Sequence, residues 1–237
     1  MACVLSQPKA ENAMNAGAEA LVVYNSNPGA PITMSMPGVT FPSVMISNDD
    51  GAAIIDAMGE TAPTGTVGSE IKRIMVPALA DTINSSSSRG PNGNQNMLKP
   101  DLAAPGTNIL SAYSPDDGGE DFNMISGTSM ASPHVAGAAA MMRQLHPDWS
   151  ANDIKTALTS TSTVDGILDD DATTAATPFP MGAGRMDLDA AAKAVLTFDK
   201  PSIAADSCVG PCTFTRTVYN KSEEDTSWSL AASSDSA

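Results

Sequence analysis

Hydrophobic and polar positions alternate in blocks over residues 1–70. A mixed segment that ends at Gly17 predicts a short helix, and the apolar residues 21–23 after it predict a strand. The same order then repeats, because residues 44–46 predict a second strand and Ser47 is a typical helix start. This pattern indicates a small α/β unit, and nothing in it suggests catalysis.

A loop and a long helix follow. Residues 84–108 are dense in Ser, Asn, Gly and Pro, which predicts an ordered loop with one short buried strand at 101–104. Residues 130–145 are nearly all small or apolar, which predicts a core helix that is buried on most sides. Gly137 within it is expected to let a neighbouring segment approach closely.

The polar side chains at the start of this helix have two explanations. One is capping, since Thr128, Ser129 and Ser132 are all cap-forming residues and Pro133 after Ser132 is typical of a first turn. Capping does not account for the additional Ser-Gly-Thr-Ser run at 126–129. That run places a hydroxyl where free N–H groups and the helix dipole stabilise an oxyanion.

The segments after this helix are mostly scaffold. Ser150 and Asp153 predict a capping box for a further helix, and His146 and Trp149 are expected to serve packing and capping. Beyond residue 198, apolar and polar residues alternate between turn signals, as in the strands of an antiparallel β-sandwich.

Composition and charge limit the classes of molecule that this protein is expected to bind. The chain has 12 Lys and Arg against 27 Asp and Glu, a formal net charge of -15, which opposes binding to nucleic acid or to an anionic membrane. Its apolar runs are shorter than the roughly 18 residues that span a bilayer, and residues 1–9 resemble no export signal. We therefore expect a folded protein with a solvated acidic surface and without nucleic-acid or membrane partners.

The three cysteines of the chain suggest either a disulfide or a metal site. Cys208 and Cys212 flank a Gly-Pro turn that brings their sulfurs together, as a disulfide in an oxidising compartment requires. A metal site is the weaker alternative, because it needs more ligands and the two histidines of the chain lie far away in sequence. Cys3 has no evident partner, and we expect no metal and no cofactor.

The segment GTSMASPHVAG at residues 127–137 resembles the nucleophile motif of the subtilisin-like serine peptidases, the subtilases. The flanking segments LKPDLAAPGTNIL, HPDWSANDIKTALTSTS and PFPMGAGRMDLDAAAKAV follow in the order of that family and extend the resemblance over residues 84–197. It implies an α/β fold, namely the C-terminal half of a subtilisin-like parallel-sheet domain. It also implies protein or peptide substrates, chemistry without a cofactor, and an extracellular location for the parent protein.

The same resemblance implies a role for each residue of the motif. Ser129 is the nucleophile that attacks the scissile carbonyl and forms an acyl-enzyme, and its own N–H serves in the oxyanion hole. The Thr128 hydroxyl assists there, Gly127 keeps the turn open to the substrate, and Ser126 lines the leaving-group side of the cleft.

A nucleophilic serine needs a base, and the histidines of this chain are badly placed for that role. His134 follows Ser129 by five residues, which is about 140° around a helix, and His146 lies roughly 25 Å away along it. In the family the triad order is Asp, His and Ser, but no histidine and no matching Gly-Asn motif precede Ser129 here. We therefore expect the chain alone to be inactive. With half of the central sheet missing, residues 135–145 should also expose apolar surface and promote aggregation.

The two ends resemble other domains. Residues 3–60 resemble the second half of a protease-associated domain, and the segment TFTRTVYN resembles the start of a fibronectin-type-III-like domain. We therefore predict three parts: a partial protease-associated domain at 1–70, the C-terminal half of the catalytic domain at 71–197, and the start of a β-sandwich at 198–237. The chain is then a fragment of a secreted serine endopeptidase. The alternative is a non-enzymatic protein-binding module that keeps the serine motif for packing.

Overall fold

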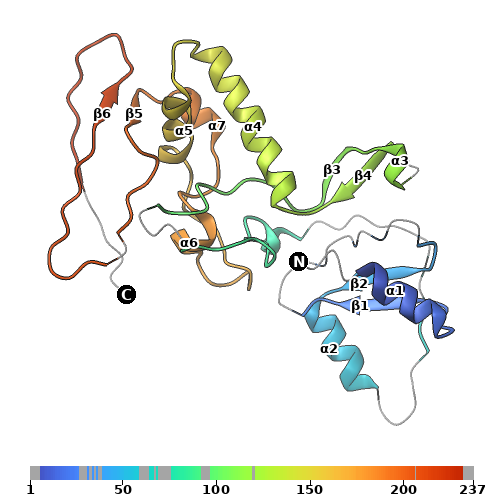
Figure 1. Ribbon diagram of the computed structural model, residues 1–237. Helices are drawn as coiled ribbons and strands as arrows, with labels where there is room; N and C mark the ends of the chain where they lie inside the picture. The colour runs from blue at the N-terminus through green and yellow to red at the C-terminus, as the bar shows by residue number, and fades with distance from the viewer. Residues whose placement is uncertain are drawn as a thin grey trace.

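The computed structural model describes residues 6–26, 31, 34, 36, 39–58, 64–66, 68, 76–91, 97–118, 121–205 and 207–231. Figure 1 shows a unit of two helices and two strands at the N-terminal end, then a hairpin, then a helical region against which the C-terminal strands lie. The elements of the N-terminal unit are α1 (Ser6–Asn15), β1 (Leu21–Tyr24), β2 (Ser43–Ile46) and α2 (Asn48–Ala57).

The N-terminal unit has the predicted order of helix, strand, strand and helix. β1 and β2 pair in parallel, from Leu21 opposite Ser43 onward. Gly17 follows α1 with a φ of 86°, and the Ser47 hydroxyl caps α2 by accepting a hydrogen bond from the Asp50 N–H. The two helices and two strands predicted for this segment are therefore confirmed.

A parallel sheet was predicted for residues 71–197, but the described part of that segment contains only fragments of one. β3 (Ile109–Ala112) and β4 (Phe122–Ile125) form an antiparallel pair, while single parallel bridges join Thr82 to Leu168 and Ala103 to Arg185. The strand predicted at 101–104 is reduced to the bridge at Ala103. We attribute this to the lack of neighbours, because an extended segment with one short partner does not propagate a ladder.

The main core lies where three helices meet: α4 (Thr128–Leu145), α5 (Ala151–Ser160) and α7 (Leu188–Ala192). Its buried residues are Ala138, Met142, Trp149, Ile154, Ala157, Leu158 and Ala191. The capping box of α5 is confirmed, since the Ser150 hydroxyl accepts from the Asp153 N–H and the Asp153 carboxylate accepts from the Ser150 N–H. His146 stacks on Trp149 with 3.9 Å between ring centroids, which confirms the packing role expected for both.

One face of α4 is buried and the rest is open. Ala138 and Met142 are buried, but Met141 is 54% and Leu145 57% exposed, and a Cβ built on Gly137 would meet nothing within 4 Å. The prediction that this helix is buried on most sides, with a close neighbour at Gly137, is therefore wrong for this chain. The exposure expected along residues 135–145 is confirmed, because α5 and α7 cover a single side of the helix.

The shorter elements complete the chain. They are the 3-10 helix Pro77–Leu79, α3 (Pro115–Gly118), α6 (Pro178–Met181), β5 (Leu196–Phe198) and β6 (Val218–Asn220). β5 crosses the boundary predicted between residues 197 and 198 and pairs antiparallel with β6. Of the residues described after β5, those of β6 alone form a strand, so the β-sandwich stays a prediction.

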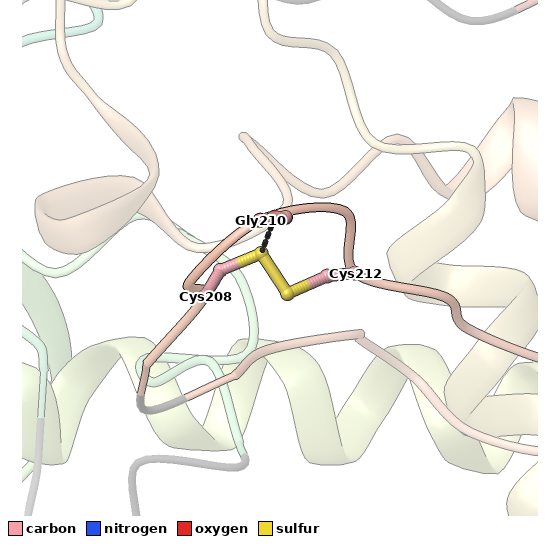
Figure 2. Close-up of a disulfide and its surroundings, with 3 residues drawn as sticks. All are labelled: Cys208, Gly210 and Cys212. Atoms are coloured by element: carbon pink, nitrogen blue, oxygen red, sulfur yellow. Dashed lines mark hydrogen bonds between the residues drawn. A yellow bond between two sulfur atoms is a disulfide. The ribbon is translucent and has the colours of Figure 1, made fainter.

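A disulfide closes a short turn within the segment that connects β5 to β6. Cys208 and Cys212 are bonded, with 5.9 Å between their Cα atoms, and the Cys208 sulfur lies 3.4 Å from the Gly210 carbonyl oxygen (Figure 2). The predicted pairing is confirmed, and Cys3 lies outside the described residues. No helix in the described ranges has the length and apolar character needed to cross a membrane.

Candidate functional site

The first turn of α4 has no side-chain cap. Gly127 occupies the N-cap position, and its carbonyl oxygen accepts the Met130 N–H at 2.9 Å. Ser132 and Pro133 therefore lie inside the helix, and their predicted role as cap and first-turn pair is wrong. Pro133 carries no N–H, so the carbonyl of Ser129 lacks the donor that an ordinary residue four positions later would supply.

Ser129 is the second residue of α4, and both it and Thr128 are exposed. The first N–H groups of a helix have no acceptor within the helix, and the helix dipole makes this end attractive to negative charge. A Cβ added to Gly127 would make only ordinary contacts, at 3.7 Å from the Ser129 nitrogen and 3.8 Å from the Met130 sulfur. Packing within the chain thus leaves room at Gly127, next to the exposed hydroxyl of Ser129.

Ser126 has a structural partner that the sequence did not suggest. Its hydroxyl oxygen accepts the Asn108 N–H at 2.8 Å and donates to the Asn108 side-chain oxygen at 3.3 Å. Asn108 has a φ of 53°, a left-handed conformation that asparagine adopts more readily than most residues. Because β3 begins after Asn108 and β4 ends before Ser126, this pair closes the base of the hairpin beside α4 (Figure 1).

The loop that precedes β3 passes directly against the first turn of α4. The Gly127 N–H donates to the Gly106 carbonyl at 2.8 Å. A Cβ on Gly106 would lie 2.8 Å from the Gly127 oxygen and 3.1 Å from the Ala131 Cβ, so a side chain there would displace the first turn. Gly106 is therefore required for the position of Ser129, although nothing at the motif itself points to it.

Asp101 anchors the same loop to α5. Its carboxylate forms ion pairs with Lys99 at 2.5 Å and with Lys155 at 3.0 Å. Partial burial raises the pKa of Asp101, but the hydrogen bonds and charges of the two lysines outweigh burial, so the net pKa is lowered. The carboxylate therefore stays charged in its place between the loop and the helix.

A cavity of about 660 Å³ lies between these loops and α4. Four residues of α4 line it, at positions that share one face of a helix: Thr128, Ala131, Ser132 and Val135. Gly127 also reaches the cavity, whereas Ser129 is not among the described residues that line it. The structure therefore brings Thr128 and Gly127 to one hollow and leaves the Ser129 hydroxyl outside that hollow, facing solvent.

Each of the two histidines has a ring nitrogen within hydrogen-bond distance of a backbone carbonyl oxygen. The His134 Nδ1 lies 2.8 Å from the Met130 carbonyl oxygen, and the His146 Nε2 lies 3.1 Å from that of Ala192. Within the described part of the chain, the Ser129 hydroxyl has no hydrogen-bonded base. These contacts agree with the helical geometry that argued against either histidine as the base.

Comparison with known proteins identifies relatives of this chain. The model of the subtilase family (Peptidase_S8) matches residues 8–184. The minor extracellular protease Vpr of Bacillus subtilis (strain 168) is 40% identical over 158 residues, which are 65% of this chain and 19% of that protein. Subtilisin-like protease SBT1.6 of Arabidopsis thaliana is 44% identical over 135 residues, 51% of this chain and 18% of that protein.

Among solved structures, fervidolysin from Fervidobacterium pennivorans matches with a TM-score of 0.34 and 24% identity, over 46% of this chain and 18% of that one. The chain thus spans about a fifth of the length of the curated relatives it matches. Because the family model covers well over half of its residues, the chain belongs to the subtilase family.

Proposed function

We propose that this chain carries the nucleophile of a serine endopeptidase, and that Ser129 is that nucleophile. The observation that supports this most strongly is the place of Ser129, exposed at the second position of α4 beside first-turn N–H groups without a side-chain cap. A hydroxyl at this point meets a substrate carbonyl where N–H donors and the helix dipole stabilise the oxyanion.

The reaction is acyl transfer in two steps. The Ser129 oxygen bonds to the carbonyl carbon and gives its proton to a base, which passes that proton to the peptide nitrogen as the C–N bond breaks and the amine leaves. The acyl-enzyme that remains is hydrolysed by water, which gives a proton to the base, and this proton returns to the Ser129 oxygen. The Ser129 N–H and Thr128 contribute to the oxyanion site, Gly127 leaves room for the peptide, and Ser126 faces the leaving-group side. The substrates are proteins or peptides.

The base has to come from outside these 237 residues. Both histidines bond to carbonyl groups of the chain, and no histidine precedes Ser129 in the sequence. A serine hydroxyl without a base is a weak nucleophile, and loss of the histidine alone lowers the turnover of subtilisin about 2 × 10⁶-fold. By itself the chain is therefore expected to be inactive as a peptidase.

The remaining parts fit a longer secreted enzyme. The parallel β1–β2 pair with its helices supports a partial protease-associated domain at residues 1–70, and β6 supports the start of a fibronectin-type-III-like domain at 198–237. An extracellular location fits the Cys208–Cys212 disulfide, since such bonds persist in oxidising compartments. It also fits the name of the Bacillus subtilis relative, a minor extracellular protease.

Labelling with a fluorophosphonate probe tests this function. The chain alone should label no faster than Ser129→Ala, whereas co-refolding with the aspartate- and histidine-bearing part of a related subtilase domain should give rapid labelling. Ser132→Ala, which changes an exposed serine of the same helix, should keep that labelling. Rapid Ser129-dependent labelling of the chain alone would contradict its inactivity. A folded co-complex that does not label would contradict the role of Ser129 and favour the protein-binding module.

A further inference from the structure

The sequence contains two Asn-X-Ser acceptor motifs for N-glycosylation, at residues 84–86 and 220–222. Such a motif is a weak signal by itself, because a glycan is bulky and needs an asparagine at the surface. In the structure, the two motifs share their side-chain hydrogen bonds and differ in their surroundings.

The side-chain hydrogen bonds within the motif are the same at both sites. At the second motif, the Ser222 N–H and hydroxyl both donate to the Asn220 side-chain oxygen, at 3.0 and 2.7 Å. At the first motif, the Ser86 N–H and hydroxyl donate to the Asn84 side-chain oxygen at 2.9 and 2.7 Å. These hydrogen bonds therefore do not distinguish the two motifs. The backbone does differ, because Asn84 begins a turn in which its carbonyl accepts the Ser87 N–H at 2.9 Å, whereas Asn220 ends strand β6.

The tertiary contacts of the two asparagines distinguish the motifs. Asn84 is half-buried, lines the large cavity, follows the buried Ile83, and donates its side-chain N–H to the Thr107 hydroxyl at 3.2 Å. A glycan would replace one of the two hydrogens on that nitrogen, next to Thr107, and would place the sugar at the wall of the cavity. Asn84 is therefore a poor acceptor in the folded chain.

Asn220 ends β6 and is exposed. The next side chain, Lys221, points toward the protein body and pairs with the Asp153 carboxylate at 2.8 Å. All three residues of β6 are exposed, so Asn220 does not belong to the packed core. Its side-chain N–H makes one contact, to the Glu224 carbonyl at 2.8 Å on the surface, so a glycan there requires no change in the core.

We infer that Asn220 is an N-glycosylation site of this protein. A transferase would use an oligosaccharide linked to a polyprenyl pyrophosphate. The bond between the sugar C1 and the pyrophosphate oxygen breaks, a bond between C1 and the Asn220 Nδ2 forms, the nitrogen loses one proton, and the lipid pyrophosphate leaves. The inference goes beyond the proposed peptidase function. It depends on one part of that proposal, namely that the protein passes through the secretory pathway.

The test is expression of the full chain behind a secretory leader in a eukaryotic cell, with peptide mapping after a glycan-removing amidase that converts a glycosylated Asn to Asp. We expect Asn220 to be converted in most molecules, in secreted and in cell-retained material alike. Ser222→Ala should abolish the conversion while leaving Asn220 in place, and Ser222→Thr, which preserves the motif, should retain it. Asn84→Gln should leave the glycan content unchanged.

Two results would overturn the inference. One is an unmodified Asn220 in both the unchanged chain and Ser222→Thr, and the other is occupancy of Asn84 equal to or above that of Asn220. Since the leader supplies the route and Ser129→Ala should be glycosylated like the unchanged chain, these results are independent of whether the peptidase assignment holds.

Discussion

Asp153 in the first turn of α5 and Lys221 directly after β6 form an ion pair, with 2.8 Å between the Asp153 Oδ1 and the Lys221 Nζ. The same carboxylate accepts hydrogen bonds from the Thr197 hydroxyl at 2.6 Å and from the Ser150 N–H at 2.9 Å. Asp153 is only 7% exposed, so its charge is largely removed from water and depends on these partners. The pair therefore ties the chain after β6 to the start of α5.

Replacing Lys221 should destabilise the fold. Lys221→Met leaves the Asp153 charge buried without its cation, and we expect the free energy of unfolding in urea to fall by up to about 3–5 kcal/mol. The matched control is Lys193→Met, because the Lys193–Asp189 pair is 73% and 79% exposed and such pairs contribute about 0.5 kcal/mol or less. Equal losses for the two variants would show that the Asp153–Lys221 pair has no special role.

Acid should weaken the fold through the same carboxylate. Burial raises the pKa of Asp153, but hydrogen bonds from Lys221, Thr197 and Ser150 outweigh burial and hold the pKa well below its usual range. A carboxyl group with a lowered pKa stabilises the fold above its unfolded pKa of about 3.9, and this stabilisation is lost as the pH falls toward the folded pKa. Unfolding free energies measured across pH should therefore decline below about pH 4–5.

The variant Asp153→Asn identifies the group responsible for that decline. It should lower stability at neutral pH and flatten the acid slope, whereas Asp189→Asn, a change in an exposed surface pair, should leave the slope nearly as it is. Asp101 contributes in the same direction, because its pKa is also lowered. An unchanged slope in Asp153→Asn would assign the acid sensitivity to other groups.

Two glycine substitutions should have opposite signs. Gly106→Ala places a methyl group 2.8 Å from the Gly127 oxygen, so the loop and the first turn of α4 must move apart, at a cost of about 1–3 kcal/mol. Gly137→Ala meets open space in the middle of α4 and should stabilise the fold by about 0.5–1 kcal/mol through helix propensity. Chemical denaturation followed by circular dichroism measures both, and the same sign for the two would contradict the packing described here.

The disulfide should be detectable by alkylation. When the chain is made under oxidising conditions, Cys208 and Cys212 should resist a thiol reagent until they are reduced, because sulfurs joined in a disulfide present no thiolate to the reagent. A Cys3→Ser variant removes the third cysteine and makes the pairing unambiguous in a peptide map. Free thiols at both positions before reduction would argue against the bond.

Local features of this protein were readable from the sequence. The cap of α2 at Ser47, the capping box of α5 and the turn between Cys208 and Cys212 all involve residues within four positions of each other, so their hydrogen-bonding chemistry is visible in short segments. The family was also readable, because the motif around Ser129 and its flanking segments occur in the order typical of subtilases.

Where the sequence led to wrong predictions, it carried no information on neighbours. Apolar composition showed that α4 suits a core, but its burial depends on what lies against it, and here α5 and α7 cover one side. The hydroxyls of Thr128, Ser129 and Ser132 suggested caps, yet α4 begins at Thr128, so all three lie within the helix and Gly127 takes the N-cap position.

The surroundings of the site were decided by the tertiary structure alone. The contact of Ser126 with Asn108, the approach of Gly106 to Gly127 and the ion pair of Asp153 with Lys221 each join segments that are distant along the chain. Hydrogen bonds and van der Waals contacts act over a few ångströms, so such partners become specific only after packing has brought their segments together. The sequence by itself therefore determined the family, the helix caps at Ser47 and Ser150 and the turn at Gly210. Packing determined what surrounds the first turn of α4.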